Sequence, residues 1–243
     1  MRASHHCTVI IPALDEEASI AQVIAEIPSW VDRIVVADNG STDRTAARAR
    51  EAGADVVSAP KRGYGSACLA GIAAAGETDI VIFVDGDLAD YPERMDTLVD
   101  PIVRDGMDMV IGSRVLGGAE AGALTTTQRF GNWLACRLIR LFWGVRHTDL
   151  GPFRAISHDA LNRLAMRDED FGWTVEMQVK AAQRGMAVTE VPVPYRKRIG
   201  TSKISGTLRG SIAAGTKILL VIFRSALRRR ERSDGKAVRF QGH

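Results

Sequence analysis

Apolar and polar positions alternate in blocks along the first half of the chain. Short apolar runs rich in Val and Ile are separated by longer stretches in which apolar residues recur at helical spacing. Unbroken apolar runs of this kind are typical of strands buried on both faces of a parallel sheet. The pattern therefore predicts strands at residues 8–11, 33–37, 54–58, 79–84 and 107–112. It predicts helices between them at residues 16–26, 43–52, 66–75 and 92–105.

The second half of the chain loses this regular alternation. Residues 117–127 are rich in Gly, Ala and Thr, which indicates a loop. Helical spacing predicts helices at residues 130–143, 159–166, 174–184 and 210–230. Residues 187–195 read as a strand, and their two prolines predict that it lies at an edge of the sheet or ends early. No segment has the roughly 18 uninterrupted apolar residues that a membrane-spanning helix needs.

Composition narrows the class of protein. A chain of 243 residues with 46% hydrophobic residues is long and apolar enough for one α/β domain with a sizeable core. Its three cysteines form no CxxC pair, so a disulfide framework or a zinc site is not expected and a reducing, cytoplasmic compartment fits. The first eight residues are polar, so no secretory signal is expected. We therefore expect a mostly parallel sheet flanked by helices.

The net charge of +3 hides a strongly basic segment near the end of the chain. Five arginines cluster there, at positions 224, 228, 229, 230 and 232. A basic cluster of this kind attracts anions such as phosphate groups or acidic lipid heads, although a solvated basic tail has the same composition. The apolar helix that precedes the cluster suits the headgroup region of a membrane. The alternatives for this helix are packing on the protein core or in a dimer interface.

The clearest chemical signal is the triplet Asp85-Gly86-Asp87, which follows the predicted strand at residues 79–84. Ligands of parallel sheets bind beyond the carboxyl ends of the strands, where this triplet falls. Two carboxylates separated by one residue can face the same hard cation, and Mg²⁺ or Mn²⁺ there would neutralise a diphosphate. The alternative interpretation is a solvated turn.

Other strand ends carry weaker signals. Asp38 follows the second predicted strand and is placed to bind a base or a ribose, whereas Asp43 is better explained as a helix cap. The basic loop at residues 61–66, which includes Arg62, could hold anions at the start of the next helix. It lacks the GK[ST] sequence of a Walker A loop.

The motifs gain meaning from their order. VIIPALDEE, VVADNGSTD, KRGYG, FVDGDLAD, MVIGSR, TDLGPFRA, GWTVEMQ, EVPVPYR and GTSKIS follow one another from about residue 8 to residue 205. This order resembles the GT-A glycosyltransferases of family 2, and most closely the branch of dolichyl- and polyprenyl-phosphate mannose or glucose synthases. The resemblance implies a GT-A fold in which a nucleotide-binding half joins an acceptor-binding half. It also implies metal-dependent, inverting transfer of a hexose from a UDP- or GDP-sugar to a lipid phosphate.

The resemblance assigns roles to individual residues. Together with Arg62 of the basic loop, the residues expected at the donor are Pro12, Ala13, Glu17, Asp38, Asn39, Asp85, Arg198, Ser202 and Lys203. Asn39 stands where a second aspartate is usual. Asp85 and Asp87 are expected to hold Mg²⁺ or Mn²⁺. The arginines expected at the acceptor phosphate are Arg114, Arg129 and Arg154.

The acceptor decides whether a base is needed. A phosphate acceptor is already anionic, so arginines need only position it, whereas a hydroxyl acceptor requires a carboxylate base. Asp149 is the candidate base, with Glu176 a weaker one. The alternatives are that Asp149 caps a turn and that Arg114 or Arg154 pairs with a buried acid.

These expectations give a domain organisation and leave competing hypotheses for the function. We expect a glycosyltransferase domain at residues 1–208, an amphipathic basic helix at 209–232 and a disordered tail at 233–243. The expected partners are a nucleotide-sugar, a lipid phosphate and the inner face of the cell membrane, with a homo-oligomer possible and no nucleic acid. The competing hypotheses are a soluble or hydroxyl acceptor, a sugar-nucleotide binder without activity, and a nucleotidyltransferase. A nucleotidyltransferase would carry a Gly-rich, Lys-containing loop after the first strand, where this chain reads PALDEE.

Overall fold

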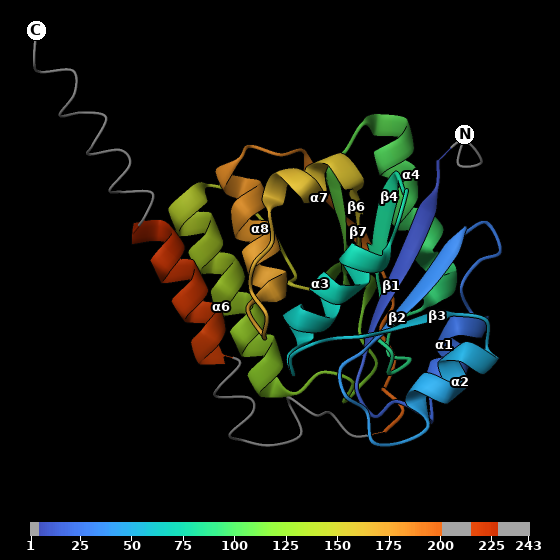
Figure 1. Cartoon of the computed structure of the whole chain (residues 1–243). Helices are drawn as coiled ribbons and strands as arrows, with labels where there is room; N and C mark the ends of the chain where they lie inside the picture. The colour runs from blue at the N-terminus through green and yellow to red at the C-terminus, as the bar shows by residue number, and fades with distance from the viewer. Residues whose placement is uncertain (1–4, 201–214, 228–243) are drawn as a thin grey trace, which may run out of the picture.

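A seven-stranded sheet forms the centre of the molecule, with helices against both of its faces (Figure 1). The computed structural model describes residues 5–200 and 215–227. The strands in chain order are β1 (Cys7–Ala13), β2 (Arg33–Asp38), β3 (Asp55–Ser58), β4 (Ile80–Phe83), β5 (Met109–Ser113), β6 (Arg154–Ser157) and β7 (Val188–Pro192). Their order across the sheet is β3-β2-β1-β4-β6-β5-β7. β6 runs antiparallel to its neighbours β4 and β5, and the other pairs are parallel.

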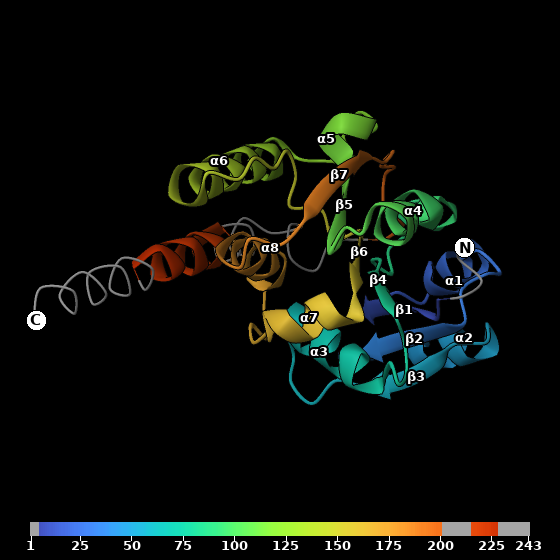
Figure 2. The same ribbon diagram turned by 90° about the horizontal axis from the view of Figure 1, so that it is seen from above.

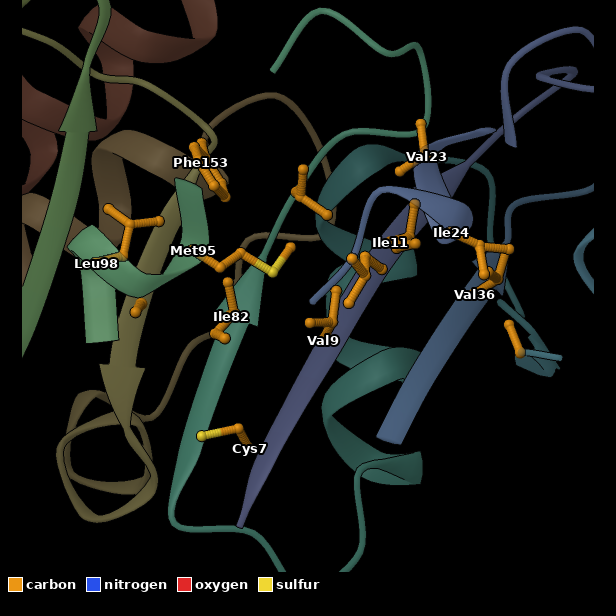
Figure 3. Packing of buried hydrophobic residues seen from close by; sticks show 14 of the residues in the cluster. Cys7, Val9, Ile11, Val23, Ile24, Val36, Ile82, Met95, Leu98 and Phe153 are labelled. Carbon is orange, nitrogen blue, oxygen red and sulfur yellow. The ribbon is translucent and has the colours of Figure 1, made fainter. Parts of the chain in front are cut away.

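Helices can pack on both faces of the sheet because the side chains of neighbouring strand residues point to opposite sides. They are α1 (Ile20–Ala25), α2 (Thr45–Glu51), α3 (Tyr64–Ala74), the 3₁₀ turn η2 (Pro92–Arg94), α4 (Met95–Asp105), α5 (Arg114–Gly117), α6 (Thr126–Trp143), α7 (His158–Leu164) and α8 (Trp173–Gln183). Val9 and Ile11 of β1 pack with residues of α1 and α4, as Figure 3 shows. Ile10 points to the other face, into the cluster that contains residues of α3, α7 and α8.

A third cluster lies beside the sheet. Residues 215–227 form a helix that packs with α6 and α8, and Figure 2 shows this group of helices projecting at one end of the molecule. Ile222 of the helix is fully buried, while Leu220, Phe223 and Leu227 are exposed. The described part of the predicted helix at residues 210–230 therefore packs on the protein with one face and leaves the other face apolar and open. Among the described residues, no helix combines the length and apolar character required to cross a bilayer.

The expected fold class is confirmed, with several local errors. α5 was not predicted, and α6 begins at Thr126, within the predicted loop at residues 117–127. β6 was not predicted because it is only four residues long and begins with an arginine. The predicted helix at residues 16–26 begins at Ile20 instead, because Asp15 has a left-handed backbone and residues 17–19 form a turn. β7 lies at the edge of the sheet, as its prolines predicted. The basic cluster at positions 228–232 and the predicted tail at 233–243 lie outside the described residues.

Candidate active site at the carboxyl ends of the strands

Two adjoining cavities open at the carboxyl ends of the central strands. The smaller has a volume of about 330 Å³, is bordered by residues at or after the ends of β1, β2 and β4, and is called the donor cavity after the residues expected there. The larger has a volume of about 1220 Å³, extends over α6, and is called the acceptor cavity after the arginines expected there. Tyr64, Asp85, Phe171 and Arg198 border both cavities. A ligand in one cavity can therefore meet a ligand in the other beside Asp85.

Most residues expected at the donor border the donor cavity. They are Pro12, Ala13, Asn39, Arg62, Asp85 and Arg198, and Asp87, which is expected to bind the metal, borders the cavity as well. Two others do not. Asp38 accepts a hydrogen bond from the backbone of Ser41 within its own turn, and Glu17 accepts one from the backbone of Arg44. Glu16 borders the cavity in place of Glu17. Ser202 and Lys203 lie outside the described residues.

The Asp85-Gly86-Asp87 turn is held in place from several sides. The Tyr64 hydroxyl donates to Asp85 over 2.9 Å, and the Ser19 hydroxyl donates to the Gly86 carbonyl over 2.7 Å. Asp87 accepts a hydrogen bond from the backbone of Ala89 through one carboxylate oxygen. Its second oxygen lies 3.0 Å from a guanidinium nitrogen of Arg198. Burial, and then the nearby Asp87, raise the pKa of Asp85 to about 6.

Asp90 adds a third carboxyl group that was not predicted as a site residue. Its residue is 1% exposed, and neither of its oxygens has a hydrogen-bonding partner among the described residues. Burial raises the pKa of Asp90 well above its usual value, and the charges of Asp85 and Asp87 raise it further. Burial therefore favours the protonated form of Asp90. The D-x-D pattern in the sequence does not include Asp90. Its significance becomes visible only from its burial in the folded chain.

The residues of this turn fit a divalent cation. Burial and mutual repulsion disfavour two ionised carboxylates at one turn, and a bound cation removes both penalties. No group of three or more His, Cys, Asp or Glu in residues 5–200 and 215–227 is arranged as a ligand set. Mg²⁺ commonly binds one or two carboxylates and completes its coordination with substrate phosphates and water. Asp85 and Asp87 therefore suit a cation that arrives with a diphosphate.

The opposite wall of the donor cavity is a basic loop that is fixed by tight packing. The Asn39 amide donates to the Lys61 carbonyl and accepts from the Gly63 backbone, both over 2.7 Å. Lys61 also pairs with Glu169 over 2.8 Å. A Cβ atom on Gly65 would lie 2.0 Å from the Asp168 carbonyl oxygen, so this position requires glycine. These contacts hold Arg62 at the donor cavity.

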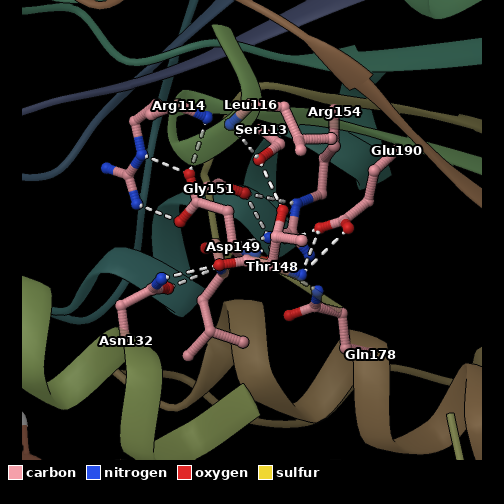
Figure 4. Close-up of polar contacts among 11 residues, drawn as sticks. Ser113, Arg114, Leu116, Asn132, Thr148, Asp149, Gly151, Arg154, Gln178 and Glu190 are labelled. Atoms are coloured by element: carbon pink, nitrogen blue, oxygen red, sulfur yellow. Dashed lines mark hydrogen bonds and ion pairs between the residues drawn. The ribbon is translucent and has the colours of Figure 1, made fainter. Parts of the chain in front are cut away.

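Arginines surround the acceptor cavity. Arg114 and Arg129, both expected there, border it together with Arg137, Arg140 and Arg146. Arg114 is oriented by Asp149, whose two oxygens lie 2.7 and 2.8 Å from its guanidinium nitrogens (Figure 4). The side chain of Asp149 is 1% exposed. The placement of Asp149 therefore does not support the expectation that it acts as a base. For Arg114, the structure shows the alternative, an ion pair with a buried acid.

Glu176, the weaker candidate for a base, is also engaged. It accepts hydrogen bonds from the backbone of Arg167 and Asp168 and pairs with Lys180 over 2.7 Å. It does not border either of the two cavities described here. Glu176 therefore stabilises the loop before α8.

Arg154 does not meet the acceptor cavity, contrary to expectation. The residue is 0% exposed, and its guanidinium donates to the carbonyls of Leu150, Gly151 and Thr174. Burial lowers its pKa to about 10, so it remains charged at neutral pH. Arg154 holds the loop that carries Asp149 and thereby supports Arg114 from behind.

Comparison with known proteins agrees with this geometry. The family model described as "Glycosyl transferase family 2" matches residues 8–165. An uncharacterized glycosyltransferase of Mycobacterium tuberculosis is 38% identical over 85% of this chain and 93% of its own length. A dolichyl-phosphate hexose transferase of Haloferax volcanii is 32% identical over 90% of this chain and 95% of its own length.

A solved structure matches over nearly the whole chain. It is glucosyl-3-phosphoglycerate synthase from M. tuberculosis in complex with Mn²⁺, UDP and glucosyl-3-phosphoglycerate. The TM-score is 0.73 at 26% identity, and the match covers 93% of this chain and 81% of that chain. The same synthase has also been crystallised with Mg²⁺ and UDP.

The raised pKa of Asp85 generates a prediction for cation binding. Only the ionised carboxylate binds a cation, so Mn²⁺ affinity should fall as the pH decreases through about 6. An ordinary aspartate would keep its charge down to a pH of about 4. The measurement is Mn²⁺ titration by calorimetry across this range, in the presence of UDP or GDP. A fall near pH 4 would contradict the assignment.

Proposed function

The chain belongs to glycosyl transferase family 2, and from that premise we propose that it transfers a hexose from a nucleotide-sugar to a polyprenyl phosphate. The reaction inverts the anomeric centre, requires Mg²⁺ or Mn²⁺ and takes place at a membrane surface. The observation that carries this proposal is the continuity of the two cavities. The acidic turn borders the donor cavity, while arginines and exposed apolar side chains both border the acceptor cavity that adjoins it.

The donor cavity suits a nucleoside diphosphate sugar. Asp85 and Asp87 would hold the cation, and that cation supplies charge stabilisation for the departing diphosphate. Arg62 and Arg198 both border the cavity and can contact phosphate oxygens through planar, charge-assisted hydrogen bonds. The sugar would then lie toward Asp85, where the donor cavity joins the acceptor cavity.

The acceptor cavity suits a phosphate more than a hydroxyl. Arg114 and Arg129 can orient an anionic oxygen, and both candidate bases, Asp149 and Glu176, are engaged elsewhere. The acceptor oxygen attacks the anomeric carbon on the side opposite the diphosphate. A new carbon–oxygen bond forms, the bond to the diphosphate breaks, and the nucleoside diphosphate leaves with the electron pair. No proton transfer from the acceptor is needed.

The mouth of the acceptor cavity supports a lipid. Val115, Phe130 and Trp133 all border the cavity, and their exposed fractions are 58%, 61% and 52%. Exposed apolar groups at a cavity mouth are typical of sites that receive apolar ligands. An isoprenoid chain can leave the cavity along these side chains while its phosphate remains with the arginines.

A soluble phosphorylated acceptor is the second candidate. The observation that favours it is the similarity to the M. tuberculosis synthase, which was crystallised with glucosyl-3-phosphoglycerate. The same arginines could orient a small phosphate ester, but the apolar mouth would then have no partner.

A transfer assay separates these candidates. UDP- and GDP-hexoses are each incubated with Mn²⁺ and either polyprenyl phosphate or 3-phosphoglycerate, and the glycosylated product is measured. We expect product with polyprenyl phosphate. Asp87→Asn should lower its rate by about a thousandfold, since electrostatic stabilisation of the leaving group is lost. Glu93→Gln, which removes an exposed charge nearby in the sequence, is the control. Product with 3-phosphoglycerate alone would support the soluble acceptor.

Docking on a membrane is supported by the outer face of α6. Phe130, Trp133 and Leu141 form an exposed stripe, in which Leu141 is 73% exposed. The guanidinium of Arg137 lies over the Trp133 ring at 5.6 Å, and the helix contains no acidic residue. An apolar stripe with basic neighbours is typical of helices that lie in the headgroup region of anionic membranes. α6 would share this role with the exposed face of residues 215–227.

Vesicle sedimentation tests this docking face. The double variant Trp133→Glu/Leu141→Glu should bind vesicles of anionic phospholipid at least several-fold more weakly, because charged side chains are costly in the apolar layer. Both positions are exposed, so stability should change little. Ala25→Glu on α1, at the opposite end of the molecule (Figure 1), adds one such acidic side chain as a control. Equal binding by the double variant would exclude α6 as the docking face.

A further inference from the structure

Arg198 lies where the two cavities meet, and its guanidinium is paired with Asp87. The distance from Nη1 of Arg198 to Oδ2 of Asp87 is 3.0 Å, and the Asp87 side chain is 6% exposed. The other oxygen of Asp87 accepts a hydrogen bond from the Ala89 backbone. Both oxygens of a residue expected to bind the cation are thus engaged by the protein itself.

The chain around Arg198 is fixed without the help of its guanidinium. The Ile199 backbone donates to the Asp87 carbonyl, and the Arg196 backbone donates to the Ala89 carbonyl, both over 2.9 Å. The Arg196 side chain donates to the Leu88 carbonyl and lies over the Tyr91 ring at 4.4 Å. The segment therefore crosses the acidic turn in a defined position. The ion pair is not required to hold it there.

A divalent cation on Asp87 and the Arg198 guanidinium compete for the same carboxylate oxygen. A cation that arrives alone must break this ion pair and leave the guanidinium without an anion in a partly buried position. A cation that arrives with a nucleoside diphosphate brings phosphate oxygens into the donor cavity, which Arg198 also borders. The guanidinium can then exchange one anionic partner for another.

We infer that Arg198 is a built-in competitor of the metal at Asp87, so that the divalent cation and the nucleoside diphosphate bind with positive coupling. The inference rests on the proposed function, because it assumes the cation site at Asp85 and Asp87. It goes further by assigning Arg198 a second role besides phosphate contact. Weak binding of the cation alone, and strong binding with the donor, is a coupling free energy between two ligands.

Calorimetric titration with Mn²⁺ tests the inference, at a pH of about 8 so that the carboxylates are ionised. Each protein is titrated alone and again with saturating UDP or GDP. Arg198→Met should bind Mn²⁺ alone about tenfold more tightly than the wild type, since a charge-assisted hydrogen bond no longer opposes binding. The factor by which the nucleotide tightens Mn²⁺ binding should shrink correspondingly. Arg198→Lys, which keeps a cation at this position, should remain close to the wild type.

Arg62→Met is the matched control, because it removes an arginine from the same cavity that has no described ion pair with an acid. It should weaken nucleotide binding but leave both the affinity for Mn²⁺ alone and the coupling factor within about twofold. If Arg198→Met, shown to be folded by circular dichroism, binds Mn²⁺ alone no more tightly than the wild type, the inference is overturned. An equal gain in Arg62→Met would also overturn it, because net charge would then explain the effect. If the wild type binds no Mn²⁺ even with nucleotide, the proposed function fails as well.

Discussion

The accumulation of negative charge at one buried turn is the constraint on which the site depends. Asp85, Asp87 and Asp90 lie within six residues, and burial disfavours the ionised form of Asp85 and Asp90. The fold answers this charge with a hydrogen bond from Tyr64 and an ion pair from Arg198, and burial raises the pKa of Asp90. A divalent cation would complete the compensation, and a diphosphate would complete the coordination of that cation. Binding of the donor with its cation would therefore neutralise the negative charge of the turn at the same time.

The acceptor cavity has the opposite requirement. Its positively charged side chains must be held in place and still remain available to a ligand. Arg154 binds the carbonyls of the loop that carries Asp149, and Asp149 in turn orients Arg114 at the cavity. Arg114 keeps part of its side chain exposed, at 14%, whereas Arg154 is completely buried. The two arginines therefore differ in position: Arg114 faces the cavity, and Arg154 supports the loop behind it. Arg198, at the junction of the two cavities, connects the acidic turn with the basic cavity.

The sequence was sufficient for features that depend on local pattern and chain order. Apolar runs identified the parallel strands, and the rule for strand ends placed Asp85 and Asp87 at the cavity. The sequence was insufficient where contacts with distant segments determine the role of a residue. Nothing local distinguishes Glu16 from Glu17, or Arg154 from Arg129, because Glu17 is engaged by Arg44, 27 residues away, and Arg154 also by Thr174, 20 residues away. β6 escaped prediction since a short antiparallel strand between two parallel neighbours leaves no periodic signal.

The central claim is that Asp85 and Asp87 hold the cation that binds the donor's diphosphate. Crystals grown with Mn²⁺ and UDP or GDP allow the metal to be located by its anomalous scattering. The account predicts one Mn²⁺ at coordination distance, about 2 Å, from a carboxylate oxygen of Asp85 or Asp87 and from the phosphate oxygens. A metal and diphosphate bound together elsewhere, with the acidic turn unchanged, would contradict it.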